Sequence, residues 1–239
     1  MVEKVVGIIG GMGPDATVDF LARVLRATPA HDDADHIRVL VDNNPKIPSR
    51  IAALIEGDGE DPLPTLIGMA RGLQTQGADF LVIPCNTAHY YLPAIARAVS
   101  IPVLDMVDLA IAWLRALAPK PRAIGMLASP AVQKVGLYAS RLKDAGFIAV
   151  FPDAAGEEKM LGVIRAVKAN AVTDRHRADY AAVAKSLTGA DAFLIACTEL
   201  SVLGPPADIS RPAVDALDAL VAETVRCARN QPQKAESKA

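Results

Sequence analysis

Strand-like runs of apolar residues alternate along the chain with longer, helix-like stretches. The apolar runs predict strands over residues 4–9, 38–42, 80–84, 103–105, 123–127, 149–151 and 192–196. The intervening stretches predict helices over residues 16–28, 62–76, 109–117, 136–145, 178–187 and 213–229. Continuous apolar runs are typical of parallel strands that are buried on both faces, and their alternation with helices indicates an α/β fold.

An internal repeat indicates two similar halves. Residues 77–87 resemble residues 189–199, because both segments begin with Gly-Ala-Asp and reach a cysteine eight positions after the glycine. A fainter echo pairs residues 6–9 with residues 124–127. Two equivalent halves of about 100 residues are the simplest explanation, and chance similarity between two short apolar strands is the alternative.

The repeat predicts two similar parallel-sheet α/β domains, and a pseudo-twofold axis relating them would place a site between the two halves. We assign residues 1–105 plus 208–239 to the first domain and residues 106–207 to the second.

The repeat also places Cys85 and Cys197 where a strand ends and a polar turn begins. Ligands of open parallel sheets bind at the carboxyl ends of the strands. If the halves face each other, the two thiols approach one crevice from opposite sides. Inversion of a stereocentre by proton transfer requires this arrangement, with a base on one face and an acid on the other. Backbone N–H groups at the start of a following helix can lower the pKa of a thiol. The third cysteine, Cys227, is expected to be a packing residue.

The overall composition narrows the classes of protein. The 239 residues carry a net charge of -2, which gives no electrostatic case for nucleic acid or an anionic membrane. No apolar run approaches the roughly 18 residues that cross a bilayer. Three cysteines argue against a disulfide framework. We therefore expect a cytoplasmic protein with a small-molecule partner.

The segment 11–16, Gly-Met-Gly-Pro-Asp-Ala, supports a second hypothesis, a nucleotide-dependent oxidoreductase, because it fits the G-x-G-x-x-A fingerprint. Asp42 lies 26 residues after Ala16, later than the usual spacing of about 20, and the equivalent loop at 128–131 has no glycine. We interpret the glycines as allowing the backbone to approach a small carboxylated ligand.

Other chemistries have weaker support. Cys85 and His89 could form an i, i+4 metal pair, but zinc needs three or four ligands, so we expect no metal. Ser129, Ser140 and Ser201 lack the context of a nucleophile elbow. A non-catalytic binding module stays open as an alternative that the paired cysteines disfavour.

Three segments resemble motifs of the aspartate racemases, within the wider aspartate/glutamate/hydantoin racemase superfamily. Residues 7–17 resemble the opening motif, and residues 84–89 and 196–200 resemble the two catalytic motifs. The resemblance extends to about residue 203. It implies a two-domain fold with pseudo-twofold halves, no pyridoxal phosphate, no metal, an active site between the domains and a homodimer.

The same resemblance implies roles for individual residues. Asn86, Thr87 and Thr198 match positions that hold the α-carboxylate and amino group of the substrate, whereas Arg50 and Lys168 match the cations for its side-chain carboxylate. An arginine grips a carboxylate through two parallel hydrogen bonds. Residues Met12 and Ser129 complete the expected substrate-binding set. Many family members have a threonine-rich turn at residues 128–132. In this chain Ser129 supplies a hydroxyl group in that turn, whereas Val132 has none.

We therefore expect a cofactor-independent racemase of aspartate, glutamate or both, with Cys85 and Cys197 as the two acid/base groups, one acting as thiolate and the other as thiol in an order that the sequence does not assign. A broad-specificity amino-acid racemase, a hydantoin racemase and a maleate isomerase are the alternatives within the superfamily. Retention of both cysteines speaks against the related arylmalonate decarboxylases, which keep one.

Overall fold

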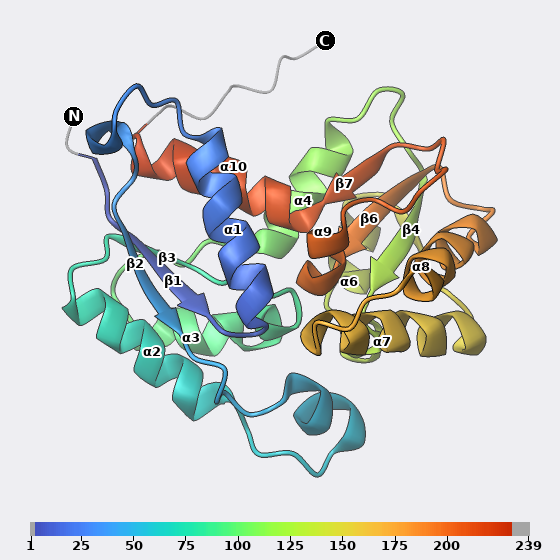
Figure 1. Cartoon of the computed structure of the whole chain (residues 1–239), viewed down its shortest axis with the longest axis horizontal. Coiled ribbons are helices and arrows are strands. Elements are labelled where there is room, and N and C mark those ends of the chain that lie inside the picture. The colour runs from blue at the N-terminus through green and yellow to red at the C-terminus, as the bar shows by residue number, and fades with distance from the viewer. Residues whose placement is uncertain (1–2, 231–239) are drawn as a thin grey trace.

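Two parallel sheets lie side by side, each covered by helices (Figure 1). The computed structural model describes residues 3–230. The strands are β1 (Val6–Gly10), β2 (Val39–Asn43), β3 (Phe80–Val82), β4 (Ala123–Ala128), β5 (Ile148–Val150), β6 (Ala192–Ala196) and β7 (Ala213–Asp215). The α-helices are α1 (Pro14–Ala27), α2 (Leu63–Thr75), α3 (Leu92–Ala98), α4 (Met106–Arg115), α5 (Pro130–Lys134), α6 (Ala139–Asp144), α7 (Ala154–Lys168), α8 (Asp174–Ser186), α9 (Thr198–Leu203) and α10 (Ala216–Ala228).

The two sheets have equivalent topologies. The first has the order β2-β1-β3 and the second the order β5-β4-β6-β7, with every pair of strands parallel. The predicted α/β class with two similar sheets is therefore confirmed. Among residues 3–230, no helix is long and apolar enough to cross a membrane.

The weak similarity between residues 6–9 and residues 124–127 reflects a packing contact that occurs once in each half. Gly7 of β1 pairs with Leu81 of β3, and Gly125 of β4 pairs with Phe193 of β6. A Cβ at Gly7 would come within 2.6 Å of the Leu81 side chain, and one at Gly125 within 2.7 Å of the Phe193 ring. Both glycines are needed because a large neighbouring side chain leaves no room for a Cβ.

The Gly-Ala-Asp motif also has one structural purpose in both halves. The Asp79 carboxylate accepts a hydrogen bond from the Val5 N–H at 2.7 Å, just before β1. The Asp191 carboxylate accepts hydrogen bonds from the Arg122 and Ala123 N–H groups at 2.8 and 2.9 Å, at the start of β4. Each aspartate thus joins the strand that leads to a cysteine to the first strand of its own half.

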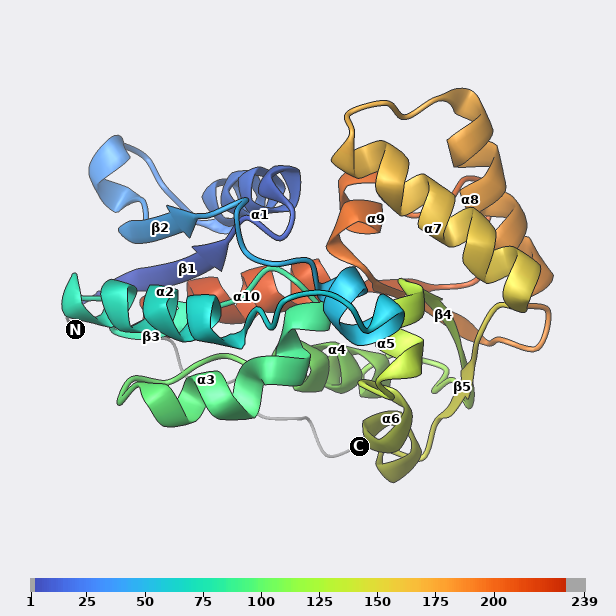
Figure 2. The same cartoon turned by 90° about the horizontal axis from the view of Figure 1, so that it is seen from below.

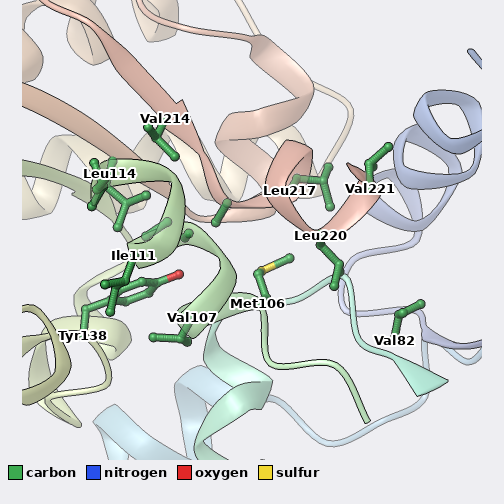
Figure 3. Close-up of a cluster of buried hydrophobic side chains, with 14 of the residues drawn as sticks. Val82, Met106, Val107, Ile111, Leu114, Tyr138, Val214, Leu217, Leu220 and Val221 are labelled. Carbon is green, nitrogen blue, oxygen red and sulfur yellow. The ribbon is translucent and has the colours of Figure 1, made fainter. Parts of the chain in front are cut away.

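Helices α4 and α10 pack against each other between the sheets and carry the largest hydrophobic cluster. Figure 3 shows Met106 of α4 close to Leu220 of α10, and Tyr138 beside Ile111 and Val107 of α4. The side chains of Met106, Val107, Leu217 and Leu220 are completely buried. This shared core fixes the position of one sheet relative to the other.

An arginine from a neighbouring helix holds the start of each central helix. Asp105 is the N-cap of α4, and its carboxylate lies 2.6 Å from the guanidinium of Arg141 on α6. Asp215 is the N-cap of α10, and its carboxylate lies 2.8 Å from the guanidinium of Arg23 on α1. The two Arg–Asp clamps therefore have the same form at the start of α4 and of α10.

The structure corrects two of the predicted elements. Residues 103–105 form an isolated parallel bridge between Val103 and Leu81 in place of a strand. Residues 213–215, predicted as the start of the last helix, form strand β7, which pairs with β6. The helix itself begins at residue 216. Segment 208–239, assigned to the first domain, therefore adds a strand to the second sheet, although its helix α10 lies against α1 (Figure 1). The predicted domain boundaries stay a prediction, and residues 231–239 lie outside the described residues.

Candidate active site

Equivalent strands bring Cys85 and Cys197 to the same cavity. Cys85 follows the end of β3, and Cys197 directly follows β6 as the N-cap of α9. Each residue is only 5% exposed, and both line one cavity of about 20 Å³. The predicted convergence of the two cysteine motifs is present in the structure. The space between the two thiols is therefore narrow.

Most of the predicted site residues line this cavity. Its lining is Met12, Arg50, Ile51, Cys85, Thr87, Ser129, Ile164, Lys168, Cys197 and Glu199. The hydroxyls of Thr87 and Ser129 come from different halves and lie 3.4 Å apart. The site is therefore assembled from both halves, as the sequence predicts.

Two predicted site residues, Asn86 and Thr198, lie next to the cysteines but do not line the cavity. Asn86 Oδ1 accepts a hydrogen bond of 2.6 Å from the Tyr138 hydroxyl. Asn86 Nδ2 and Thr198 Oγ1 are buried with no hydrogen-bond partner among residues 3–230. Since buried polar atoms nearly always have a partner, these two atoms are suited to bind a polar ligand.

Gly11 of the glycine-rich opening loop packs against the backbone of Asn44. Gly11 has φ of 95°, and a Cβ there would lie 2.2 Å from the Asn44 carbonyl oxygen. The Gly11 N–H donates to Thr17 Oγ1 at 2.9 Å. Our interpretation that this glycine makes room for a carboxylated ligand is corrected, because its close approach is to Asn44. The loop holds Met12 in the cavity wall.

The two predicted cations reach the cavity from separate segments. Arg50 precedes the π-helical turn η2 (Ala52–Glu56), which contacts α5 of the second half (Figure 2). Its Nε is buried with no hydrogen-bond partner among the described residues, and its Nη1 donates to the Pro48 carbonyl at 3.1 Å. Lys168 is the last residue of α7, and its Nζ lies 3.4 Å from Glu199 Oε1.

The surroundings of Cys85 only partly oppose its ionisation. Burial raises the pKa of the Cys85 thiol and is the largest influence. The positive charges of Arg50 and Lys168 and a backbone hydrogen bond from Ala88 lower this pKa, whereas the charge of Glu199 raises it. Arg50 is the strongest of the groups that favour the thiolate.

The surroundings of Cys197 oppose ionisation more strongly. Burial raises the pKa of the Cys197 thiol well above its ordinary value, and the charge of Glu199 and a hydrogen bond to it raise the pKa further. The Cys197 thiol donates that bond to Glu199 Oε2 at 3.2 Å. Lys168 lowers the pKa of Cys197, as does a backbone hydrogen bond from Glu199. The charged neighbours therefore differ in sign, with Arg50 favouring ionisation of Cys85 and Glu199 opposing ionisation of Cys197.

His89, four residues after Cys85, has a structural place. The Met106 N–H donates to His89 Nε2 at 3.0 Å, so Nδ1 carries the ring proton and donates to the Cys85 carbonyl at 2.9 Å. Burial lowers the pKa of the ring. Among residues 3–230, no group of three His, Cys, Asp or Glu side chains is placed to hold a metal. His89 thus anchors the Cys85 loop to the start of α4.

Ser201 takes the corresponding place four residues after Cys197. Its hydroxyl donates to the Asp215 carboxylate at 2.7 Å and lies 3.4 Å from the Cys197 carbonyl oxygen. Each cysteine loop is therefore held against the first residues of a central helix, α4 or α10.

Glu199 lines the cavity, although its place in the sequence was not predicted to belong to the site. The apolar lining residues Ile51 and Ile164 were not predicted either. A signal for Glu199 was present in the repeat, because it stands two residues after Cys197, where the other half has Thr87 after Cys85. An acid that replaces a hydroxyl at matched positions beside a thiol indicates a difference in chemistry.

Comparison with known proteins agrees with this geometry. The sequence model of the Asp/Glu/hydantoin racemase family matches residues 9–224. The chain is 32% identical to the aspartate racemase of Picrophilus torridus, with a TM-score of 0.85 over 98% of this chain and 97% of that one. An aspartate racemase homologue from Pyrococcus horikoshii OT3 shares the fold, at 19% identity and a TM-score of 0.73 over 95% and 99% of the two chains.

Among curated proteins, the broad specificity amino-acid racemase RacX of Bacillus subtilis (strain 168) is 26% identical over 225 residues, which is 92% of this chain and 96% of RacX. These matches are to racemases, so they speak against the two other hypotheses, a nucleotide-dependent oxidoreductase and a non-catalytic binding module. The chain belongs to the Asp/Glu/hydantoin racemase family and is an amino-acid racemase.

Proposed function

We propose that this protein interconverts the enantiomers of aspartate, glutamate or both, with Cys85 and Cys197 as the two proton-transfer groups. The observation that carries the proposal is the convergence of two buried thiols, on equivalent strands of two halves, in one cavity that two cations also line. A substrate with its α-carbon between the thiols would meet a proton acceptor on one face and a proton donor on the other.

Binding groups are available for each part of an acidic amino acid. Asn86 Nδ2 and Thr198 Oγ1, which lack partners among the described residues, would donate to the α-carboxylate together with the Thr87 hydroxyl. The guanidinium of Arg50 would form a bidentate pair with the side-chain carboxylate, and Lys168 would add a second positive charge.

The difference between the thiols suggests their resting states. Cys85, beside Arg50, would be the thiolate, and Cys197, whose S–H donates to Glu199, would be the thiol. The Cys85 thiolate removes the α-proton, negative charge develops toward the α-carboxylate, and the Cys197 thiol protonates the opposite face. Hydrogen bonds to the α-carboxylate stabilise the transition state, and a closed cavity strengthens them by excluding water.

A broader substrate range is the second candidate, because the chain is similar to a broad specificity racemase along most of its length. Rates for aspartate, glutamate, alanine and lysine, measured side by side, separate the candidates. Arg50 and Lys168 favour acidic substrates, so we expect kcat/KM to be highest for aspartate or glutamate. Equal values for alanine would support the broader range.

The test of the proposed function is racemisation by protein that has been dialysed against a chelator, followed by chiral chromatography. We expect full activity without added pyridoxal phosphate, nicotinamide or metal. In heavy water, the inverted product should contain solvent deuterium from the earliest time points, while the remaining substrate stays mostly protiated. A requirement for a cofactor, or substrate hydrogen in the product at early times, would contradict the two-thiol mechanism.

We also propose a homodimer and a cytoplasmic location, which were expectations from the sequence. Apolar side chains are exposed on α1 and α4, including Val18 at 60%, Leu25 at 52% and Trp113 at 40%. Light scattering after size-exclusion chromatography tests the dimer, and a monomer at micromolar concentration would rule it out.

A further inference from the structure

The side chain of Glu199 lies between two cavities. One is the active-site cavity of about 20 Å³, and the other is a second cavity of about 70 Å³ at the start of α1. The second cavity is lined by Gly13, Pro14, Asp15, Ala16, Val167, Lys168 and Glu199. Because Pro14, Asp15 and Lys168 are exposed residues, this cavity adjoins solvent. Its volume is sufficient for at least one water molecule.

The contacts of the Glu199 carboxylate point in both directions. Oε2 accepts the hydrogen bond from the Cys197 thiol at 3.2 Å. Oε1 has no hydrogen-bond partner among residues 3–230, although Lys168 Nζ lies 3.4 Å away. The side chain is only 8% exposed. Buried carboxylates without full pairing are rare, so one oxygen of Glu199 has capacity to accept a further proton or hydrogen bond.

A two-thiol racemase has to restore its protonation state after every inversion. Each turnover leaves the former base as a thiol and the former acid as a thiolate. The enzyme can repeat the same conversion only after one thiol has lost a proton and the other has gained one. Cys197 is only 5% exposed, and a group that contacts both its thiol and a second cavity would give its proton a route to solvent that does not pass through the substrate-binding space.

We propose that Glu199 relays protons between Cys197 and water in the second cavity. In one direction the Cys197 S–H bond breaks, the proton binds the Glu199 carboxylate, and the resulting carboxylic acid gives it to water. In the other direction water protonates Glu199, and the O–H bond breaks as the Cys197 thiolate takes the proton. No electrons are transferred. The relay rests on the proposed two-thiol function, and it deepens that function by making proton exchange unequal for the two cysteines.

Cys85 has no equivalent group. The position two residues after it is Thr87, whose hydroxyl faces Ser129 and does not titrate at physiological pH. Its closest charged influences are Arg50, Glu199 and Lys168, all on the active-site cavity. Cys85 therefore exchanges its proton through the active site itself, when that cavity opens.

The test measures whether a proton from one substrate molecule is kept on a thiol and passed to the next. In heavy water, the enzyme receives α-protiated L-substrate together with α-deuterated, ¹³C-labelled D-substrate. Mass spectrometry of the ¹³C-labelled L-product measures carried-over protium. A second mixture exchanges the roles of the enantiomers, so that each mixture reports on a different cysteine.

Glu199→Gln keeps an acceptor for the Cys197 thiol but cannot carry a proton. Because positioned acids and bases accelerate proton transfer by roughly 100-fold or more, we expect carried-over protium to rise about tenfold in one mixture and to stay unchanged in the other. Glu199→Asp, which keeps an ionisable group, should show an intermediate increase. Circular dichroism and thermal unfolding verify that each variant is folded.

Glu223→Gln is the matched control. Glu223 also accepts a hydrogen bond from a cysteine thiol, that of Cys227 on α10, at 3.4 Å, but it does not line either cavity. We expect wild-type isotope patterns from this variant.

Three results would overturn the relay: no change with Glu199→Gln, an equal increase in both mixtures, or the same change with Glu223→Gln. A wild-type enzyme that does not racemise acidic amino acids, or that works without its thiols, would instead overturn the proposed function.

Discussion

The loops that follow Cys85 and Cys197 differ much more than the strands that carry them. The strands share register, glycine position and the Gly-Ala-Asp turn. Two residues after the cysteine, however, one half has Thr87 and the other has Glu199. Arg50 is the leading charge that favours ionisation at Cys85, whereas the leading charge at Cys197 is that of Glu199, which opposes it.

This contrast teaches that a repeated fold can supply matched positions while its loops supply unmatched chemistry. Two thiols in identical surroundings would have the same pKa, and neither would be preferred as base or acid. The charges of Arg50 and Glu199 make the two pKa values different. Five predictions sharpen the comparison.

The largest effect is expected from removing either thiol. Cys85→Ala and Cys197→Ala should each lower the rate of racemisation by at least about 10³-fold, since a positioned acid or base contributes roughly 10²–10⁴-fold. Exchange of the α-proton in heavy water, followed by NMR, should persist for one enantiomer in the first variant and for the other enantiomer in the second. Cys227→Ala is the control and should retain activity. If both variants exchange the same enantiomer, the thiols are not opposed.

Removing the arginine on the Cys85 side should have the next largest effect. Arg50→Ala should lower kcat/KM for an acidic substrate by about 10–100-fold, because a hydrogen bond to a charged group contributes roughly 1.5–3 kcal/mol. Arg50→Lys should restore little of this loss, since an ammonium group cannot form the bidentate pair.

The same variant tests the electrostatic contrast. The Arg50 charge lowers the pKa of Cys85, so Arg50→Ala should raise that pKa and move alkylation of Cys85 to higher pH, with a smaller change at Cys197. Lys46→Ala, which removes an exposed cation from the same segment, is the control. A wild-type pH profile for Cys85 in Arg50→Ala would rule out this role of Arg50.

In the wild-type protein, the pH dependence of alkylation should differ between Cys85 and Cys197, and we expect this difference to be smaller than the effects of the substitutions above. Burial raises the pKa of both, so reaction with iodoacetamide should accelerate as pH rises, and Cys85 should reach its half-maximal rate at a lower pH than Cys197. Peptide mass spectrometry follows each site. An acidic substrate should protect both thiols but leave the half-buried Cys227 reactive. Faster alkylation of Cys197 would reverse the assigned resting states.

The smallest effects are expected from the two Arg–Asp clamps, and they concern stability. Arg23 is 16% exposed, and it also donates to the Ser201 carbonyl, whereas Arg141 is 31% exposed. We expect Arg141→Ala to lower the free energy of unfolding by about 1 kcal/mol or less, and Arg23→Ala by about 2 kcal/mol because the side chain of its partner Asp215 is only 9% exposed. Urea unfolding measures both. Equal losses would show that burial does not distinguish the clamps.

Most of the architecture could be predicted from local sequence. Parallel strands buried on both faces must be apolar throughout, so the central strands were recognisable, and the repeat indicated both the second half and the paired cysteines. The failures lie at the edges of the sheets. Residues 103–105 and 213–215 are equivalent segments that end at the N-caps Asp105 and Asp215. Only residues 213–215 pair as a strand, whereas residues 103–105 form a single bridge. Pairing at an edge depends on the neighbouring strand, which a single segment does not encode.

The sequence by itself determined the fold class, the repeat and the positions of Cys85 and Cys197 at strand ends, because burial and turn formation act within short segments. Only the tertiary structure decided which groups surround each thiol. Arg50 belongs to a segment that contacts the other half, and Lys168, at the end of α7, comes within 3.4 Å of Glu199 only in the folded chain. Charge interactions act through space at distances of a few ångströms. Their effect on each thiol therefore depends on the packing of both halves.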